Sequence, residues 1–248
     1  FTATSRSITT CRAAYTTLIA TFPKSKFTTE AWVRLGEYYF DAYDVPDALT
    51  KAAEAYEHAI EDKTHPLYDK ALYKLGWTYY RMDNFDEAVD RFIALLDYYQ
   101  AKAKERGDET AGGDLRAEAL QYTAVSFVDE KWGSLAKAQE KIGKLGGRPW
   151  EGELYRRMAD IYFDQTKGAE AIEAYRLVLQ KDPLIKDAPQ IQQKIVQAYE
   201  RDRKLEEAFA ESSKLANMFG PGTPWNEKWK RDPDVITAAA ELAEKSLY

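Results

Sequence analysis

The residue types that most often carry catalysis or bind metals are scarce in this 248-residue chain. Its two histidines, His58 and His65, do not have the spacing with which a His-Glu-x-x-His helix holds a catalytic zinc ion. They could share one side of a helix, but Pro66 would end such a helix at once, so we interpret both as surface residues. The single cysteine, Cys11, excludes an internal disulfide framework and a cysteine-ligated zinc site.

A glycine-rich stretch and a group of carboxylates also lack the features of a reactive site. The stretch 143–147 has neither the Lys-Ser/Thr ending nor the preceding strand of a phosphate-binding loop, and we interpret it as a connecting loop. Asp83, Asp86, Glu87 and Asp90 stand where acidic side chains cap helices and keep them soluble, and no calcium-binding loop is complete. We therefore predict a chain that is not an enzyme and that has no catalytic residue, no cofactor and no metal.

Composition narrows the class of protein further. A hydrophobic fraction of 45% and an aromatic fraction of 13% are typical of a globular chain with a buried core. The net charge is −6 and the basic residues are scattered, which argues against nucleic acid as a partner. Charges interrupt every apolar run well before the roughly 20 residues that a membrane span needs. Because the chain starts at Phe1 without a signal pattern, we expect a processed protein or a piece of a longer one.

The elements that must position these residues repeat along the chain. The phrase WVRLGEYYF at 32–40 returns as LYKLGWTYY at 72–80, and each copy is followed by an alanine and, four positions later, by an aromatic residue. About five and a half copies can be recognised, and such a period decides the architecture. The later pairs are Ala52 with Tyr56 and Ala88 with Phe92. A third copy contains Ala159, Tyr162, Ala171, Tyr175 and Pro183, a fourth contains Tyr199 and Ala208, a weaker copy centres on Ala124 and Phe127, and half a copy lies at Cys11, Tyr15 and Pro23.

The spacing within one copy is typical of two antiparallel helices. Apolar residues at i, i+3, i+4 and i+7 form one helical face, as at positions 72–79. Small residues are expected where the helices come closest, since a larger side chain would hold them apart. The small residues are Gly36, Gly76, Ala88, Ala159 and Ala171, and polar or glycine-bearing turns are predicted at Asp83-Asn84, Lys167-Gly168 and Asp202-Arg203.

Trp32, Leu35, Gly36 and Tyr39 carry a resemblance to a known family. They match, residue for residue, the Trp, Leu-Gly and Tyr of the tetratricopeptide pattern, whose unit is about 34 residues. The chain therefore resembles the tetratricopeptide repeat family. The resemblance implies an all-α fold, a right-handed superhelical solenoid of antiparallel helix pairs with about five repeats plus partial terminal units. Cys11 falls on a small-residue place of this pattern, which implies a packing role.

We expect a single tetratricopeptide-like solenoid over residues 1–248, with two interruptions. The spacing between copies is too long within 101–114, a charged stretch with glycines that we predict to be an extended helix end followed by a bend or mobile loop. Residues 219–234 are too rich in proline and glycine for helix and should form an irregular connection. Its Trp225 and Trp229 could form an exposed contact or fold back as a cap. An alanine-rich helix should follow.

In this family the first helix of each pair lines the concave inner surface and supplies most ligand contacts. Counting from the start of each repeat carries those places onto this chain, where the resemblance implies a groove for a partner protein. The implied groove residues are Val33, Glu37 and Phe40; Tyr73, Trp77 and Tyr80; Gln121, Val125 and Val128; Arg156, Asp160 and Phe163; and Gln193, Gln197 and Glu200.

The aromatic groove residues Phe40, Tyr73, Trp77 and Tyr80 allow two interpretations. Rigid amphipathic rings are common anchors in peptide recognition, so these side chains could hold a partner. They could equally pack against the neighbouring repeat. The lysines and asparagine with which some family members grip the carboxylate of chaperone tails are incompletely matched, so we predict no such clamp.

Two stretches point to a compartment. Residues 22–40 and 71–92 resemble repeats of bacterial cell-envelope proteins of the outer-membrane assembly, cell-division and gliding-motility kinds. This resemblance implies the bacterial periplasm or cell envelope, with the cytoplasm as the alternative. We therefore expect a non-enzymatic scaffold that binds an extended peptide or helix of a protein partner, as a component of a multiprotein envelope complex. The alternatives are a regulatory or targeting arm of a larger enzyme or multidomain protein, and a solenoid that binds a small ligand or lipid.

Overall fold

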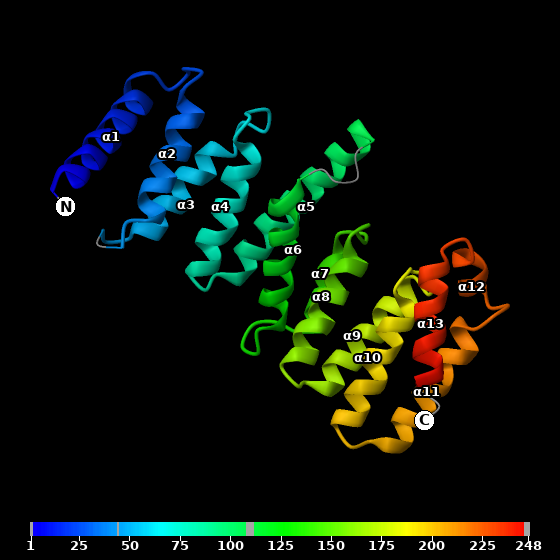
Figure 1. The fold of residues 1–248 in the computed structure, drawn as a ribbon. Coiled ribbons are helices and arrows are strands. Elements are labelled where there is room, and N and C mark those ends of the chain that lie inside the picture. Colours follow the sequence, from blue (N-terminus) through cyan, green and yellow to red (C-terminus); the bar gives the residue numbers. More distant parts are fainter. Residues whose placement is uncertain (1, 44, 108–111, 246–248) are drawn as a thin grey trace. The chain divides into compact units, whose positions relative to one another are not determined.

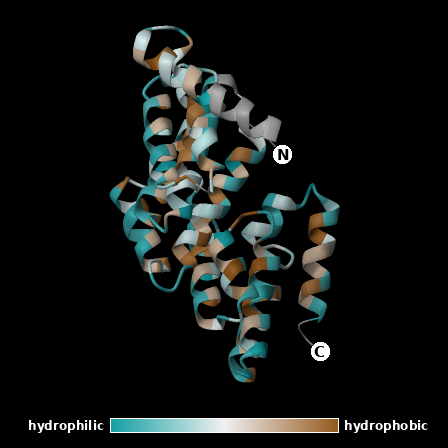
Figure 2. Cartoon of the chain, turned by 90° about the vertical axis from the view of Figure 1, so that its left-hand side faces the viewer, coloured by the Kyte–Doolittle hydropathy of each residue, from teal (hydrophilic) through white to brown (hydrophobic). Residues whose placement is uncertain are grey.

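The computed structural model describes residues 2–43, 45–107 and 112–245, and over these residues the chain is built from helices without a strand (Figure 1). Many helices carry both hydrophobic and hydrophilic residues around their circumference (Figure 2), as expected when one face is buried. The helices are α1 (Thr2–Thr21), α2 (Thr28–Phe40), α3 (Ala48–Ala59), α4 (Tyr68–Arg81), α5 (Phe85–Arg106), α6 (Gly113–Val128), α7 (Leu135–Lys144), α8 (Glu151–Asp164), α9 (Gly168–Lys181), α10 (Ala188–Arg201), α11 (Leu205–Phe219), α12 (Pro224–Trp229) and α13 (Pro233–Lys245).

Consecutive helices pack against one another in pairs. Helix α2 packs on α3, α4 on α5, α8 on α9 and α10 on α11, and each pair is joined by a short turn. The second helix of a pair also packs on the first helix of the next, as α3 does on α4 and α9 on α10. This arrangement confirms the prediction of an all-α, tetratricopeptide-like solenoid of helix pairs. Its right-handed superhelical sense stays a prediction.

The helices divide into two compact units, residues 1–123 and 124–248, with the border inside α6. In the first, α5 continues to Arg106, which confirms the predicted extended helix end, and Gly107 follows it with a φ of 64°. The predicted bend or loop contains residues 108–111, which lie outside the described residues. The organisation of residues 1–248 as a single solenoid stays a prediction.

The repeated glycines Gly36 and Gly76 are explained by aromatic rings. A Cβ atom on Gly36 would lie 2.6 Å from the Tyr56 ring, and one on Gly76 would lie 2.7 Å from the Phe92 ring. Both distances are far shorter than a van der Waals contact allows. The close approach that the sequence predicts between helices is therefore present, but it joins a helix backbone to the aromatic ring of the second helix rather than two backbones.

The turns within three of the helix pairs share one geometry. Asp83, Thr166 and Arg203 have φ values of 55°, 59° and 58°, and the amide that follows each donates to a carbonyl five residues earlier at 2.9–3.0 Å. This left-handed residue after a helix is a standard way to end it. A Cβ on Gly168, the first residue of α9, would lie 2.5 Å from a carboxylate oxygen at the flexible end of the Asp202 side chain.

The connection after α11 folds back over the turn between α9 and α10. Trp225 is 1% exposed and its indole N–H donates to the Ile185 carbonyl at 2.8 Å. The indole of Trp229 donates to the Leu184 carbonyl at 2.9 Å. Of the two roles left open for these tryptophans, the structure supports the cap. The expectation that this stretch is too rich in proline for helix is wrong at α12, because Pro224 stands at the start of that helix, where its missing N–H costs nothing.

Candidate functional site

Phe40 ends α2 and lies under two cations from α4. The Lys74 ammonium is 4.6 Å and the Arg81 guanidinium 4.5 Å from the centre of the Phe40 ring. Arg81 also donates to the Phe40 carbonyl at 2.6 Å, which satisfies one of the free carbonyls at the end of α2. The Lys74 ammonium makes no hydrogen bond among the described residues, so it can still bind an acceptor from outside the chain.

The same arrangement recurs in the unit 124–248. Phe163 lies near the end of α8, and the Arg201 guanidinium is 4.1 Å from its ring centre while donating to its carbonyl at 2.6 Å. The Lys194 ammonium lies 5.4 Å from the same ring. In both units a phenylalanine at the end of one first helix is thus covered by a lysine and an arginine of the next, seven positions apart. Rings and cations so placed attract each other and hold the two helices in register.

The aromatic groove residues Tyr73, Trp77 and Tyr80 belong to a packed cluster of rings. Trp77 lies 4.2 Å from Tyr122 of α6 and 5.5 Å from Tyr80, measured between ring centres. Tyr73 lies 6.5 Å from Trp77, and its hydroxyl donates to the carboxylate of Glu118. All three groove rings are half-buried. These contacts favour packing between α4 and α6 as one role of the rings and leave part of each ring accessible.

Arg156 and Asp160, two further groove residues, lie in one polar network. The Asp160 carboxylate accepts hydrogen bonds from Tyr175 and Lys194, both at 2.6 Å, and from Arg156 at 3.3 Å. Arg156 also pairs with Asp187. Burial alone would raise the pKa of Asp160, but the hydrogen bonds and the nearby cations outweigh it and hold that pKa below its usual value. The network ties α8, α9 and α10 together around an ionised carboxylate.

The remaining groove residues are not equally accessible. Val33 is 3% exposed in the core around Tyr56, and Val128 is buried, so neither reaches the surface. Glu37 pairs with Arg34 at 3.0 Å on the surface of α2. Gln121, Val125 and Gln193 are half-buried, whereas Gln197 and Glu200 are exposed on α10.

Sequence reasoning missed the basic residues that cover the two phenylalanines. The family pattern places ligand contacts by counting from the repeat start, and that count passes over Arg81, Lys194 and Arg201. The available signal was a lysine followed seven positions later by an arginine on two first helices, since residues at that spacing share a helical face. Such a pair would point to a cationic side of the predicted groove.

The two histidines have local structural roles. His58 is half exposed, stacks on Trp32 with ring centres 4.4 Å apart and lies 2.9 Å from the Glu61 carboxylate. His65 accepts a hydrogen bond from the Leu67 amide at 3.2 Å. Within the described ranges, no three histidine, cysteine or acidic side chains come together as metal ligands would. None of the helices described is both long enough and apolar enough to cross a membrane.

The paired helices, and the face that their first helices form, are typical of one class of repeat protein. A model of the tetratricopeptide repeat matches residues 27–101, which comprise α2, α3, α4 and most of α5. Over this segment the chain is similar to the tetratricopeptide repeat family. Proteins of this family generally mediate protein–protein interactions and are typically non-catalytic. No curated protein sequence matches the chain.

Proposed function

We propose that this chain is a non-enzymatic scaffold that binds a segment of a protein partner along the face of its first helices. The observation that carries the proposal is the recurrence of one arrangement in both units, a half-buried phenylalanine covered by a lysine and an arginine. Each copy offers an apolar ring beside cationic donors, which together suit a peptide that carries both apolar side chains and hydrogen-bond acceptors.

The unpaired ammonium of Lys74 supports this proposal. Packing of Phe40 is already supplied by Arg81, which both covers the ring and binds the carbonyl. A second cation on the same ring adds little to packing but provides a donor for a partner. Trp77 and Tyr73, which are half-buried nearby on α4, supply apolar surface to the same face.

A test substitution must obstruct the face of the first helices without removing a ring from the aromatic cluster. Truncating Trp77 is unsuitable, because it would also leave a cavity beside Tyr122. We would immobilise the chain, capture proteins from the source extract and identify them by mass spectrometry. Gln197→Arg, at an exposed place on α10, should reduce capture of the bound protein at least about tenfold through steric and charge conflict. Lys74→Ala should weaken it without changing helical content.

The matched control is Glu207→Arg, which adds the same side chain to an exposed place on α11, a second helix. It should leave capture unchanged. Equal capture by the Gln197→Arg, Lys74→Ala and control variants would contradict binding along the first helices.

We also propose that the scaffold works within a bacterial cell-envelope assembly. The support is the amino-acid sequence of residues 22–40 and 71–92, which resembles repeats of envelope proteins. Fractionation of source cells with an antibody against the chain provides the test. Recovery with periplasmic or envelope markers is expected, and recovery only with cytoplasmic markers would refute this placement.

A further inference from the structure

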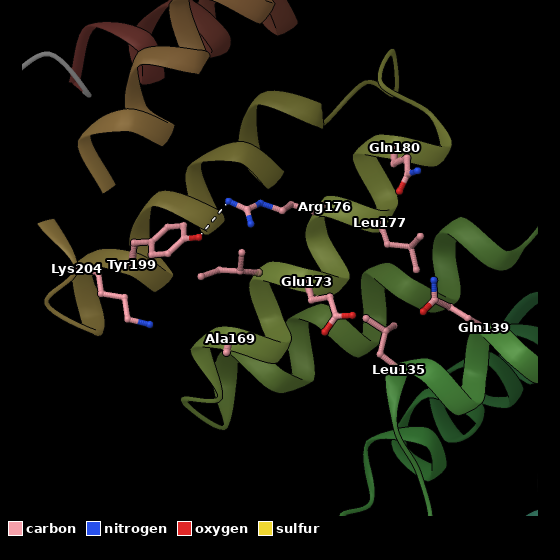
Figure 3. A pocket seen from close by; sticks show the side chains of 10 residues that line it. Leu135, Gln139, Ala169, Glu173, Arg176, Leu177, Gln180, Tyr199 and Lys204 are labelled. Carbon is pink, nitrogen blue, oxygen red and sulfur yellow. Dashed lines mark hydrogen bonds between the residues drawn. The ribbon is translucent and has the colours of Figure 1, made fainter. Parts of the chain in front are cut away.

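A cleft of about 380 Å³ in the unit 124–248 is lined mainly by the second helices α7 and α9 and by none of the implied groove residues (Figure 3). It follows α9, where the lining residues recur every three or four positions and so share one helical face. Helix α7 borders the cleft on one side, and the chain around the turn from α10 to α11 borders it on the other. The α9 residues in its lining are Ala169, Ile172, Glu173, Arg176, Leu177 and Gln180.

The side of the cleft next to α10 and α11 has its charges satisfied within the chain. Arg176 donates to the buried carboxylate of Glu211 at 2.5 Å and to the Tyr199 hydroxyl at 3.0 Å. Lys204 lies 3.8 Å from the Asp202 carboxylate. Both cations in the lining thus have an acidic partner, so this side offers no uncompensated positive charge to a ligand.

The side next to α7 carries polar groups without partners. Glu173, Gln139 and Gln180 are exposed, and none of them makes a side-chain hydrogen bond or ion pair with any described residue. Figure 3 shows Glu173 and Leu177 directed from α9 toward Leu135 and Gln139, while Arg176 points the other way, to Tyr199. Leu135 and Leu177 line the cleft together with these polar side chains and supply apolar surface to it.

The charge on this side is negative. Glu173 is the one ionisable side chain in the cleft lining that lacks an oppositely charged partner among the described residues. Glu170, one turn earlier on α9, is also exposed and unpaired within them. Burial raises the pKa of the Tyr162 hydroxyl on α8, and the charges of Glu170 and Glu173 raise it further. A cationic side chain is therefore the favoured counterpart.

The free amides indicate the conformation of that counterpart. Each glutamine amide can donate and accept at once, which matches the paired N–H and C=O groups of a peptide backbone. In a bound helix those backbone groups are used internally, whereas an extended segment leaves them free. In an extended segment, residues two positions apart face the same side, so a cationic and an apolar residue can both point into the cleft.

We propose that this cleft binds an extended peptide segment that places a lysine or arginine opposite Glu173 and an apolar side chain over Leu135 and Leu177. The site is separate from the face of the first helices, so the scaffold would hold two partner segments, or two parts of one partner, on different sides. This goes beyond the function proposed above and does not depend on it.

Three labelled peptides of equal length test the proposal by fluorescence anisotropy. One has a Leu-Ser-Lys-Ser-Leu core, and the others replace its Lys with Glu or Ser. We expect the Lys peptide to bind roughly tenfold more tightly than the Glu peptide. Glu173→Lys should reverse this order, Gln139→Ala should weaken all three peptides, and Glu207→Lys, the same change at an exposed place on α11, should leave the order intact.

Several results would overturn the site. They are failure of the Lys peptide to bind at millimolar concentration, an unchanged order of affinities in Glu173→Lys, or a helical circular dichroism signal from the bound peptide. The outcome is separable from that of the proposed function, because Gln197→Arg should not alter binding of these peptides and Glu173→Lys should not alter capture on the first helices.

Discussion

Tyr56 and Tyr175 occupy the same place in two helix pairs, but only the hydroxyl of Tyr175 has a partner. Tyr175 donates to the Asp160 carboxylate at 2.6 Å, whereas the buried hydroxyl of Tyr56 makes no hydrogen bond within the described part of the chain. A third pair has Phe92 at this place. The repeat therefore requires the aromatic ring, which packs on the first helix. Whether the ring carries a hydroxyl, and whether that hydroxyl is hydrogen-bonded, differs from one helix pair to the next.

This difference predicts opposite effects for one substitution at two places. Tyr56→Phe removes a buried hydroxyl without a partner and should leave the free energy of unfolding unchanged or raise it by about 1 kcal/mol. Tyr175→Phe leaves Asp160 with one donor fewer and should lower it by roughly 1–3 kcal/mol, since the acceptor is charged. Urea unfolding followed by circular dichroism measures both. A loss of stability in Tyr56→Phe as large as that in Tyr175→Phe would contradict the assignment.

Glycines in first helices differ in what surrounds them, and this predicts different responses to alanine. Gly76→Ala would place a Cβ 2.7 Å from the Phe92 ring and should destabilise the chain by about 1–3 kcal/mol through overpacking. At Gly152 in α8, an added Cβ would have no neighbouring atom within 4 Å. Gly152→Ala should therefore stabilise the chain by up to about 1 kcal/mol, through the better helix propensity of alanine. Thermal melts of the two variants give the comparison, and equal melting temperatures would show that Phe92 moves aside freely.

Features that depend on neighbouring positions could be predicted from the sequence. The glycine at 36 or 76 and the aromatic residue of the following helix recur at regular spacings, so the helix pairs and their small contact residues followed from the pattern. The end of α5 near Arg106 followed from the charged stretch that extends it. The left-handed turn residue at Thr166 did not, because the glycine at 168 placed the predicted turn at Lys167-Gly168.

Contacts between separate helices could not be predicted in the same way. Asp160, Tyr175 and Lys194 come from three helices, and the sequence assigns each to a face without fixing which side chains meet. The covering of Phe40 by Arg81 depends likewise on how α4 packs against α2. The predicted groove therefore stays a prediction, although the structure shows which of its residues are exposed, which are paired and which, such as Val33, are buried.

The backbone conformation of Thr166 predicts local strain. It is a β-branched residue with a φ of 59°, a conformation that costs a non-glycine residue roughly 1–2 kcal/mol. Thr166→Gly removes that cost and adds a smaller entropic one, so the free energy of unfolding should rise by about 0.5–1 kcal/mol. Gln165→Gly, at the preceding residue with an ordinary φ of −79°, is the control and should lower stability. If both variants lose stability in urea unfolding, the left-handed turn at Thr166 is not strained.

The buried carboxylate of Glu211 should make a contribution to the free energy of unfolding that is lost in acid. Its side chain is 7% exposed, and burial alone would raise the pKa of its carboxyl. Hydrogen bonds from Lys214, Gln192 and Arg176 outweigh burial and lower that pKa below the usual value. Because the folded state has the lower pKa, the stabilisation is fully present above the unfolded pKa of about 4.3 and is lost as the pH falls below it.

The corresponding variant is Glu211→Gln, which keeps the shape and removes the charge. It should cost on the order of 2 kcal/mol at pH 7, because two cations lose their buried partner, and progressively less from pH 7 downward as the pH falls through the lowered pKa of the native carboxyl. Denaturant unfolding of both proteins across this pH range measures the difference, with the exposed Glu207→Gln as control. A stability difference that does not shrink as acid protonates the native carboxyl would mean that the charge of Glu211 contributes nothing and that its hydrogen bond to Gln192 carries the whole effect.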